Sequence, residues 1–261
     1  MYDLPQMRAA VDAWWRGLRR AFGAEGLNDL PSELTRPSDL EALLMSPELK
    51  LAQTCGYPLT HALAGRVVPV ATPAYAAPGC VGPTYVSQLI VPAGSAFGTL
   101  ADLRGRAAAI NGWDSQSGMS ALRHAVAPLA EDGGFFSDVV VSGSHVRSIA
   151  AVAAGEADVA AIDCVTYALI ERYDPALLAA VRILGQSAPA PGLPYVTHAG
   201  ADGDLIQRLR AGLARAVADP AFADVRADLL IADIAVLDLA AYDRIVEMET
   251  AVADMGYPRL N

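Results

Sequence analysis

Apolar residues recur along the chain at two spacings, and each spacing predicts one kind of element. Between residues 4 and 22 the spacing is three to four positions, which predicts an amphipathic helix. The positions that share its apolar face are Val11, Trp14, Trp15, Leu18 and Phe22. In RPSDLEALLMSPEL, Ser38 fits an N-cap and Glu41 lies three residues on, as in a capping box, so we expect a second helix there.

Short apolar runs predict strands in the segments that follow. LKLAQT and RVVPVAT lie on either side of an expected turn at Gly56-Tyr57-Pro58, and TYVSQLIVPAG, residues 84–94, predicts a longer strand. From residue 106 the chain alternates. Strands are predicted at RAAAIN, DVVVSG, ADVAAID and AVRILGQ, and helices at 116–129, at HVRSIAAVAAG up to Gly155, and at 165–172. This alternation is typical of βαβ units and a parallel sheet.

The segment SAPAPGLPYVTHAG breaks the alternation with three prolines and two glycines, and we interpret it as a connection between lobes. Helices are expected beyond it near 205–217 and 242–255, with a strand at LLIADIAVL between them. The chain has 261 residues, enough for one large domain or two lobes of ordinary size.

Composition excludes several classes of function. Apolar residues make up 53% of the chain, which supports a substantial core. The net charge is −10 and Lys50 is the only lysine, which argues against a nucleic-acid or anionic-membrane surface. A polar pocket for one anion stays compatible with this charge, because a pocket depends on its own few groups.

The cysteines, Cys55, Cys80 and Cys164, are odd in number and lack paired spacing, so neither a disulfide framework nor a metal site is expected, and no cofactor is implied. No apolar run reaches the roughly 18 residues of a membrane span. The first 22 residues lack the continuous apolar region of a signal peptide. We expect a periplasmic protein if an export segment is missing from this sequence, and a cytoplasmic one otherwise.

Polar residues follow each of the four strands predicted between residues 106 and 186. They are Asn111, Asp114, Ser115, Gln116 and Ser117; Ser142, Gly143, Ser144 and His145; Asp163, Cys164 and Thr166; and Gln186 and Ser187. In an open parallel sheet, ligands bind beyond the carboxyl ends of the strands. We therefore expect all four strand exits to open on one edge of the sheet.

The first two exits also begin helices, where free N–H groups and the helix dipole favour an anion. Ser115 and Ser117 add hydroxyl donors, and Gly118 lets the backbone approach closely. Plain N-capping uses the same residue types and is the alternative interpretation. The convergence of four polar exits favours a ligand site.

His145 can bind an oxyanion as an imidazolium or as a neutral donor, and a structural or solvated role is its alternative. Asp163 can orient His145, accept a proton from a monoprotonated oxyanion, bind an amine, or simply cap the next helix. The presence of Ser, His and Asp at one edge is also typical of a hydrolase, which is a further alternative. The GxSxG signature is absent around Ser115 and Ser117, and a triad is defined by geometry, so hydrolysis is disfavoured.

Three segments carry a family resemblance. GWDSQSGMSALR, VVVSGSHVRSIAAVAAGEADVAAIDC and TYVSQLIVPAGSAFGTLADLRGRAAAIN resemble the phosphate/phosphite/phosphonate-binding proteins of ABC transporters, the PhnD-like group, within a match over about residues 51–199. The resemblance implies the type II periplasmic-binding-protein fold. Two α/β lobes, each a mostly parallel sheet flanked by helices, are joined by two crossing hinge strands and close over the ligand.

On this basis lobe 1 comprises residues 1–90 and 185–261, lobe 2 comprises residues 91–184, and TYVSQLIV and PGLPYVTHA carry the crossings. The resemblance assigns ligand contacts to Ser115, Gln116, Ser117, His145, Asp163 and Tyr85, and from the first lobe to Thr54, Gly56 and Tyr57. Gln116 stands where a Thr is common in the family. No catalytic or metal-binding residue is implied.

The resemblance therefore predicts a solute-binding protein without catalysis, which captures phosphate, phosphite or a phosphonate between its lobes for an ABC transporter. Its partners are the small oxyanion and the permease subunits, and the protein is expected as a monomer or weak dimer. Two alternatives share the fold. One is an enzyme of cofactor biosynthesis, for which Cys55, His145 and Asp163 supply reactive groups. The other is a cytoplasmic ligand sensor.

Overall fold

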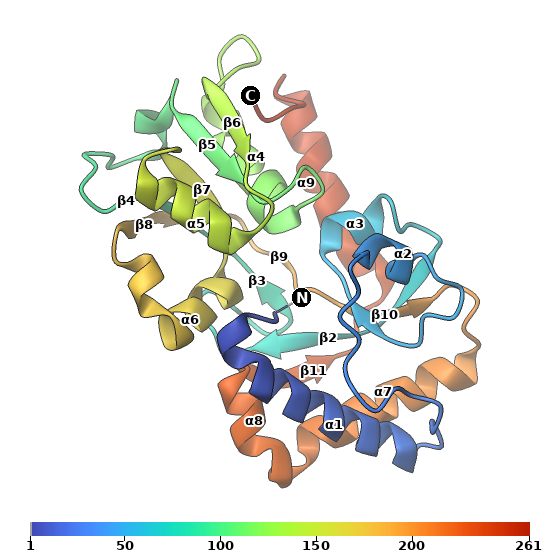
Figure 1. The fold of residues 1–261 in the computed structure, drawn as a ribbon. Coiled ribbons are helices and arrows are strands. Elements are labelled where there is room, and N and C mark those ends of the chain that lie inside the picture. The colour runs from blue at the N-terminus through green and yellow to red at the C-terminus, as the bar shows by residue number, and fades with distance from the viewer. Residues whose placement is uncertain (1) are drawn as a thin grey trace. The chain divides into compact units, whose positions relative to one another are not determined.

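The computed structural model describes residues 2–261, which fold into two compact units (Figure 1). Unit 1 comprises the chain up to Ala76, Val81–Pro83 and Gly192–Ala241. Unit 2 comprises Ala77–Cys80, Thr84–Pro191 and Tyr242–Asn261. Within residues 2–261, no helix has both the length and the apolar character needed to cross a bilayer.

Unit 1 is built on a four-stranded sheet in the order β1-β10-β2-β11. The strands are β1 (Ala52–Gln53), β2 (Val67–Tyr75), β10 (Tyr195–His198) and β11 (Ile231–Ala235). Every neighbouring pair in this sheet is antiparallel, so the prediction of a mostly parallel sheet is wrong for this unit. The physical reason is that β10 separates the consecutive strands β1 and β2, so no βαβ crossover places parallel strands side by side.

The helices of unit 1 are α1 (Arg8–Ala24), α2 (Leu40–Leu44), α3 (Gly56–Thr60), α7 (Gly203–Ala218) and α8 (Ala223–Asp228). Helix α1 buries the predicted face at Trp14, Trp15, Leu18 and Phe22, with Val11 half-buried. It packs closely on α7, because a Cβ on Gly212 would lie 2.3 Å from the Phe22 ring.

Two local predictions in unit 1 need correction. Helix α2 begins one residue later than predicted, because the Asp39 side chain accepts a hydrogen bond from the Ala42 N–H at 2.9 Å. Asp39 is therefore the N-cap in place of Ser38, and the capping box with Glu41 does not form. The expected turn at Gly56-Tyr57-Pro58 is the first turn of the short helix α3.

Unit 2 contains a five-stranded sheet in the order β6-β5-β7-β4-β8. The strands are β4 (Ser87–Pro92), β5 (Ala107–Ile110), β6 (Asp138–Val141), β7 (Val159–Asp163) and β8 (Val181–Gln186). Strands β5, β6 and β7 are parallel, and β4 is antiparallel to both β7 and β8. It follows that β8 runs in the same direction as β7. The carboxyl ends of all four predicted strands therefore share one edge, which confirms that expectation.

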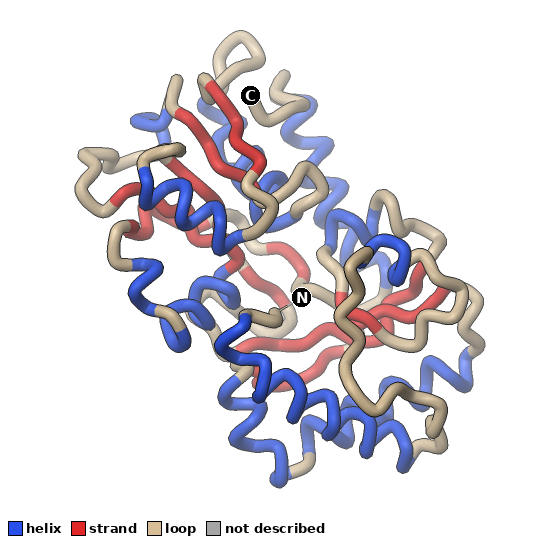
Figure 2. The backbone as a smooth tube through the Cα atoms, in the orientation of Figure 1, coloured by secondary structure: helices blue, strands red, loops and turns tan. Residues whose placement is uncertain are grey.

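The helices of unit 2 are α4 (Ala121–Val126), α5 (His145–Ala154), α6 (Cys164–Tyr173) and α9 (Asp243–Asp254). A π-helical turn, η3 (Gln116–Ser120), leads directly into α4. Helix α5 ends at Gly155 in the left-handed conformation, as predicted, with a φ of 75°. Helical segments lie on both sides of this sheet (Figure 2), as opposite crossover directions from β5 to β6 and from β6 to β7 require.

The remaining elements are short. The strand predicted at 84–94 is divided into β3 (Thr84–Tyr85) and β4, and β3 pairs with β9 (Ala190–Pro191). Single 3₁₀ turns are Pro5–Met7, Leu100–Leu103, Ala127–Leu129, Pro175–Leu178, Pro220–Phe222 and Leu239–Tyr242. The chain passes between the units beside β3 and β9, where the Gly192 N–H donates to the Pro83 carbonyl at 2.7 Å.

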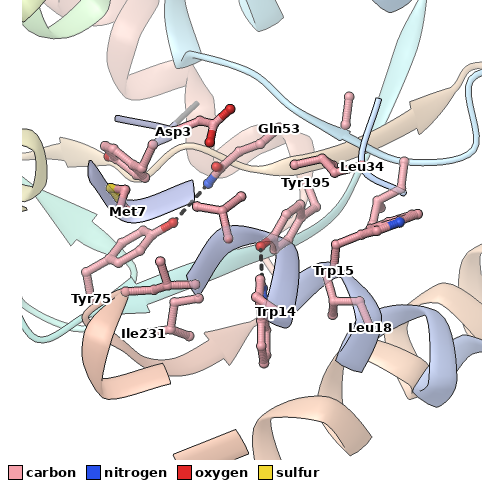
Figure 3. A pocket seen from close by; sticks show the side chains of 15 residues that line it. Asp3, Met7, Trp14, Trp15, Leu18, Leu34, Gln53, Tyr75, Tyr195 and Ile231 are labelled. Carbon is pink, nitrogen blue, oxygen red and sulfur yellow. Dashed lines mark hydrogen bonds between the residues drawn. The ribbon is translucent and has the colours of Figure 1, made fainter. Parts of the chain in front are cut away.

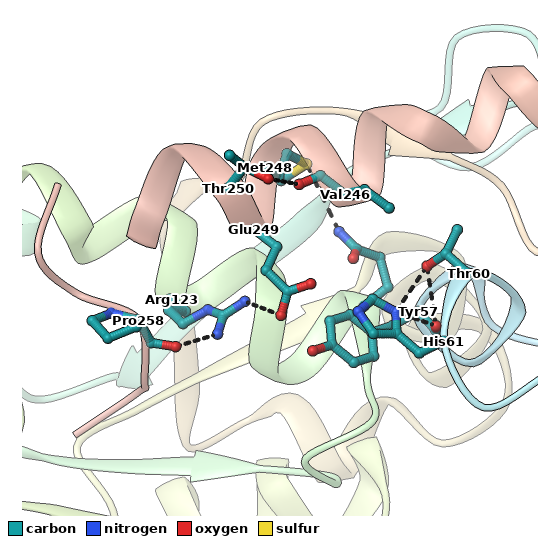
Figure 4. A network of polar contacts seen from close by, with 10 residues as sticks. Tyr57, Thr60, His61, Arg123, Val246, Met248, Glu249, Thr250 and Pro258 are labelled. Atoms are coloured by element: carbon teal, nitrogen blue, oxygen red, sulfur yellow. Dashed lines mark hydrogen bonds and ion pairs between the residues drawn. The ribbon is translucent and has the colours of Figure 1, made fainter. Parts of the chain in front are cut away.

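The unit boundaries differ from the predicted lobes. The predicted boundary after residue 90 falls inside β4 and the one after residue 184 falls inside β8, yet both strands pair in the sheet of unit 2 on either side of these positions. The C-terminal segment also belongs to unit 2. Buried Arg123 on α4 donates to the Pro258 carbonyl at 2.8 Å and to Glu249 on α9 at 3.4 Å (Figure 4). These bonds hold α9 against α4.

Candidate functional site

The first strand exit of unit 2 leads from β5 into η3. The Ser115 hydroxyl accepts a hydrogen bond from the Gly118 N–H at 2.9 Å, which makes Ser115 the N-cap. Residues Gln116–Ser120 form one π-helical turn and are all buried. Such turns are rare in helices and are frequent at functional sites. The predicted capping role of Ser115 is confirmed, and its hydroxyl hydrogen is still able to donate.

Gly118 is required by close packing at this helix start. A Cβ at this position would lie 1.8 Å from Asn111 Oδ1 and 2.9 Å from Asn111 Cγ. Because contacts below 3.0 Å are essentially never made by a Cβ atom, the Asn111 side chain occupies the space that any residue other than glycine would need. The polar end of β5 is thereby packed directly on the first turn of the following helix.

The second exit leads from β6 into α5 and is tied to the first by Ser142. The Ser142 hydroxyl lies 3.0 Å from the Ile110 carbonyl at the end of β5, 3.0 Å from the Ser144 carbonyl and 2.7 Å from the Ser148 hydroxyl. Ser144 is the N-cap of α5 and accepts from the Arg147 N–H. Ser148 was not among the residues predicted at this edge, although it is the one serine inside the apolar helix pattern HVRSIAAVAAG.

Ser117 and His145 meet at these two helix starts. The Ser117 Oγ lies 2.8 Å from the His145 Nε2, and the two residues belong to elements that follow adjacent parallel strands. Ser117 is 5% exposed and His145 is half-buried. A hydroxyl and an imidazole therefore meet where two helical segments begin, at one edge of the sheet. That they contact a ligand remains a prediction.

Burial determines the charge state of His145. Its inner ring nitrogen, Nδ1, is inaccessible to solvent. Burial lowers the pKa of His145 to about 4, and a hydrogen bond with the Ala161 backbone opposes this shift. Of the two forms considered for an anion contact, the neutral imidazole is therefore the one present near neutral pH.

The third and fourth exits are occupied by local hydrogen bonds. Buried Asp163 accepts from the N–H groups of Val165 and Thr166 at 2.8 and 2.9 Å, so the capping interpretation is confirmed for this residue. The Ser187 hydroxyl accepts from the Ser87 N–H at 2.9 Å, and the Gln186 amide donates to Gln88 Oε1 at 3.3 Å. These two side chains join β8 to β4.

The amide of Gln116 faces the C-terminal helix. Gln116 is 1% exposed, and its Nε2 lies 3.9 Å from the sulfur of Met248 on α9. The sequence patterns did not place α9 beside this helix start, because that helix was expected in the other lobe. The contact between Gln116 and Met248 therefore could not be predicted from the sequence.

The other predicted contacts lie in two places. Tyr85 is a buried residue of β3 in unit 2. In unit 1, Thr54 is 2% exposed and donates its N–H to the Pro194 carbonyl, and Gly56 begins α3. The Tyr57 ring stacks on the ring of His61 with centroids 3.9 Å apart (Figure 4). This stacking was not predicted, although the four-residue spacing of Tyr57 and His61 favours a contact between residues of one helical turn.

Unit 1 also contains a cavity of about 150 Å³ that the sequence did not predict (Figure 3). Its lining is mostly apolar and includes Trp14, Trp15 and Ile231. Two pairs of its polar groups are bonded to each other: Trp14 Nε1 donates to the Tyr195 hydroxyl at 3.4 Å, and Gln53 Nε2 donates to the Tyr75 hydroxyl at 3.1 Å. Its carboxylate, Asp3, pairs with Arg36. None of the predicted ligand residues lines it, and its chemistry does not suit an oxyanion.

Comparison with protein families gives one match of wide coverage. The family described as the periplasmic substrate-binding protein of ABC phosphonate transporters matches residues 36–248 of this chain. No curated protein matches the chain.

Three solved structures illustrate the fold. The binding protein component of an ABC phosphonate transporter from Pseudomonas aeruginosa has a TM-score of 0.74 at 18% identity, covering 93% of this chain and 82% of its own. PhnD1 from Prochlorococcus marinus, in complex with methylphosphonate, has a TM-score of 0.73 at 11% identity and 94% coverage of both chains. A Xanthomonas citri protein bound to chloride ion has a TM-score of 0.72 at 17% identity, covering 98% and 95%. At these identities the likeness shows the type II periplasmic-binding-protein fold.

Proposed function

The chain belongs to the family of periplasmic phosphonate-binding proteins of ABC transporters, and we propose that it binds a small phosphorus oxyanion without converting it. The ligand class comprises phosphate, phosphite and phosphonates. The observation that carries the proposal is the 2.8 Å contact between Ser117 and His145, which brings two helix starts to one point. From the family we also infer that its partners are the permease subunits of a transporter and that it is located in the periplasm. The family match favours transport over an enzyme of cofactor biosynthesis or a cytoplasmic sensor.

The donors at this point are neutral, which suits an anion held by hydrogen bonds. When neutral His145 carries its proton on Nε2, it donates to Ser117 Oγ, and the hydroxyl groups of Ser117 and Ser115 are left to donate to the ligand together with backbone N–H groups of the turn. Buried Asp163 at the neighbouring strand end would repel a ligand that carries no proton and would accept a hydrogen bond from one that does. We therefore expect monoprotonated phosphorus oxyanions to bind better than sulfate.

Within the proposal, Gln116 contributes an amide where the family commonly has a hydroxyl. Thr54, Gly56 and Tyr57 of unit 1 and Tyr85 of unit 2 are further contacts on the basis of the resemblance. The chain's net charge of −10 does not oppose this assignment, because hydrogen bonds at short range decide the affinity of such a site.

Isothermal titration calorimetry with methylphosphonate, phosphite, phosphate and sulfate tests the proposal. We expect at least one phosphorus oxyanion to bind, and the Ser117→Ala variant to bind it roughly 5- to 150-fold more weakly, the equivalent of about 1–3 kcal/mol. Ser120→Ala is the matched control, because Ser120 is buried in the same turn and its hydroxyl has no hydrogen-bond partner among the described residues. Absence of binding to all four ligands, or equal affinities of wild type and Ser117→Ala, would contradict the proposal.

A further inference from the structure

Two of the cysteines form a close pair that the proposed function does not use. Cys80 Sγ and Cys164 Sγ lie 3.5 Å apart in unit 2, although the residues are 84 positions apart in the sequence. Both are free thiols. The spacing of cysteines along the chain gave no sign of this pair, because the fold alone brings the two segments together.

A tight turn presents Cys80 to its partner. The Cys80 N–H donates to the Ala77 carbonyl at 3.0 Å, with Pro78 in the second position of the turn and Gly79 in the third. Gly79 has a φ of +101°, and proline followed by a glycine of positive φ is the signature of a type II turn. The turn is therefore specified by its own sequence and holds Cys80 in a defined place.

Gly79 is also needed for the turn to approach Cys164. A Cβ on Gly79 would lie 2.7 Å from Val86 Cγ2 and 3.4 Å from Cys164 Cβ, so a larger residue would push the turn away. Cys164 is held from the other side, because it begins α6 and donates its N–H to the Val86 carbonyl at 3.0 Å. Both thiols are thus positioned by backbone that has little freedom to separate them.

We propose that Cys80 and Cys164 are a disulfide-forming pair, closed by exchange with a disulfide from the surroundings. The sulfurs must approach by about 1.5 Å to reach the roughly 2.05 Å of a disulfide bond, a distance within reach of side-chain rotation. An oxidising compartment such as the periplasm favours the closed form. This inference stands apart from the proposed ligand site and does not depend on it.

The two thiols have different parts in the exchange. Half-buried Cys80 attacks an external disulfide as a thiolate, forming a mixed disulfide and releasing one thiolate that takes up a proton. Cys164, 1% exposed, then loses its proton and attacks Cys80 Sγ, which expels the second thiol. Two protein thiols and one external disulfide thereby yield one protein disulfide and two external thiols.

The electrostatic surroundings agree with this order of attack. The hydrogen bond with Cys164 lowers the pKa of the Cys80 thiol. The same hydrogen bond, together with burial and the charge of Asp163, raises the pKa of the Cys164 thiol. Cys80 is therefore the thiol that ionises first, and Cys164 is the one that resolves the mixed disulfide.

The closed disulfide would join the turn at 77–80 to the start of α6, next to Asp163 at the predicted ligand edge. It would also close a loop of 84 positions and so constrain the unfolded chain. We expect oxidation to raise the Tm by roughly 5–15 °C for a chain of this length.

Thiol counting by alkylation and intact mass spectrometry tests the pair. After reduction, the denatured wild type should take up three equivalents of N-ethylmaleimide, and after equilibration with oxidised glutathione it should take up one, at Cys55. Peptide mapping should then show a Cys80–Cys164 link. Cys164→Ser should hold a stable mixed disulfide with glutathione at Cys80. Cys55→Ser is the matched control, because it leaves the pair intact and should still gain the same rise in Tm.

Three results would overturn the inference, and none requires a variant to fold. They are uptake of three equivalents after oxidation, a link that includes Cys55, and a link between two molecules. If oxidation lowers the thiol count of the wild type to one but leaves its Tm unchanged, the disulfide does not stabilise the protein.

Discussion

Replacement of Gly118 by alanine is a strict test of how the first helix start is built. The added Cβ would lie 1.8 Å from Asn111 Oδ1 and 3.2 Å from Ser115 Oγ. The Asn111 side chain cannot stay where it is, and the hydrogen bond from the Gly118 N–H to Ser115 must lengthen or break. The substitution therefore disturbs the capping of the helix and the position of Ser117 together.

The size of the effect follows from three contributions. Overpacking of a tight site costs about 1–3 kcal/mol, and loss of an N-cap costs about 1 kcal/mol. The higher helix propensity of alanine offsets about 0.5–1 kcal/mol of this. We expect a net loss of roughly 1–3 kcal/mol in the free energy of unfolding, or about 3–10 °C in Tm for a chain of this size.

The assay is denaturant unfolding combined with calorimetric titration of a phosphorus oxyanion. Gly185→Ala is the matched control, because a Cβ there meets no heavy atom within 4 Å and Gly185 does not have a positive φ. The control should differ from wild type by at most about 0.5 kcal/mol. If Gly118→Ala is as stable as wild type and binds with the same affinity, the described packing of Asn111 under the helix start is wrong.

Two further predictions concern protonation and the C-terminal helix. Burial lowers the pKa of His145 from 6.5 to about 4, so the unfolded chain takes up a proton at a higher pH than the folded chain. The free energy of unfolding is therefore highest above about pH 6.5, and it falls by up to roughly 3 kcal/mol as the pH drops towards 4. Denaturant midpoints across this range should show a flatter profile for His145→Gln, and equal profiles would contradict the burial argument. Arg123→Met should lower the free energy of unfolding by about 1–3 kcal/mol, because the Pro258 carbonyl loses a charged donor. Calorimetric melting measures this loss, and an unchanged Tm would contradict the role of Arg123 in holding the C-terminal segment.

The sequence predicted the elements whose signal is local and repeated. The βαβ alternation gave β5, β6 and β7, and Gly155 marked the end of α5 through its need for a positive φ. Because parallel strands carry their polar ends to one edge, the meeting of Ser117 and His145 could be anticipated from the order of elements alone.

What the sequence could not give depends on which segments the fold brings together. The antiparallel sheet of unit 1 arises from pairing between β2 and strands far away in the chain, for which no local pattern exists. The Cys80–Cys164 pair has the same origin. The place of α9 was missed because its apolar face indicates burial and does not identify a partner.

A double-mutant cycle on methylphosphonate affinity tests most directly whether Ser117 and His145 bind one oxyanion together. It compares wild type, Ser117→Ala, His145→Gln and the double variant by calorimetry, with folding of each checked by thermal melting. We expect each single change to weaken binding, and the double change to weaken it by less than the sum of the two, with a coupling of at least about 0.5 kcal/mol. If either single variant binds methylphosphonate as tightly as wild type, or if the two losses of binding free energy simply add, Ser117 and His145 do not bind one oxyanion together.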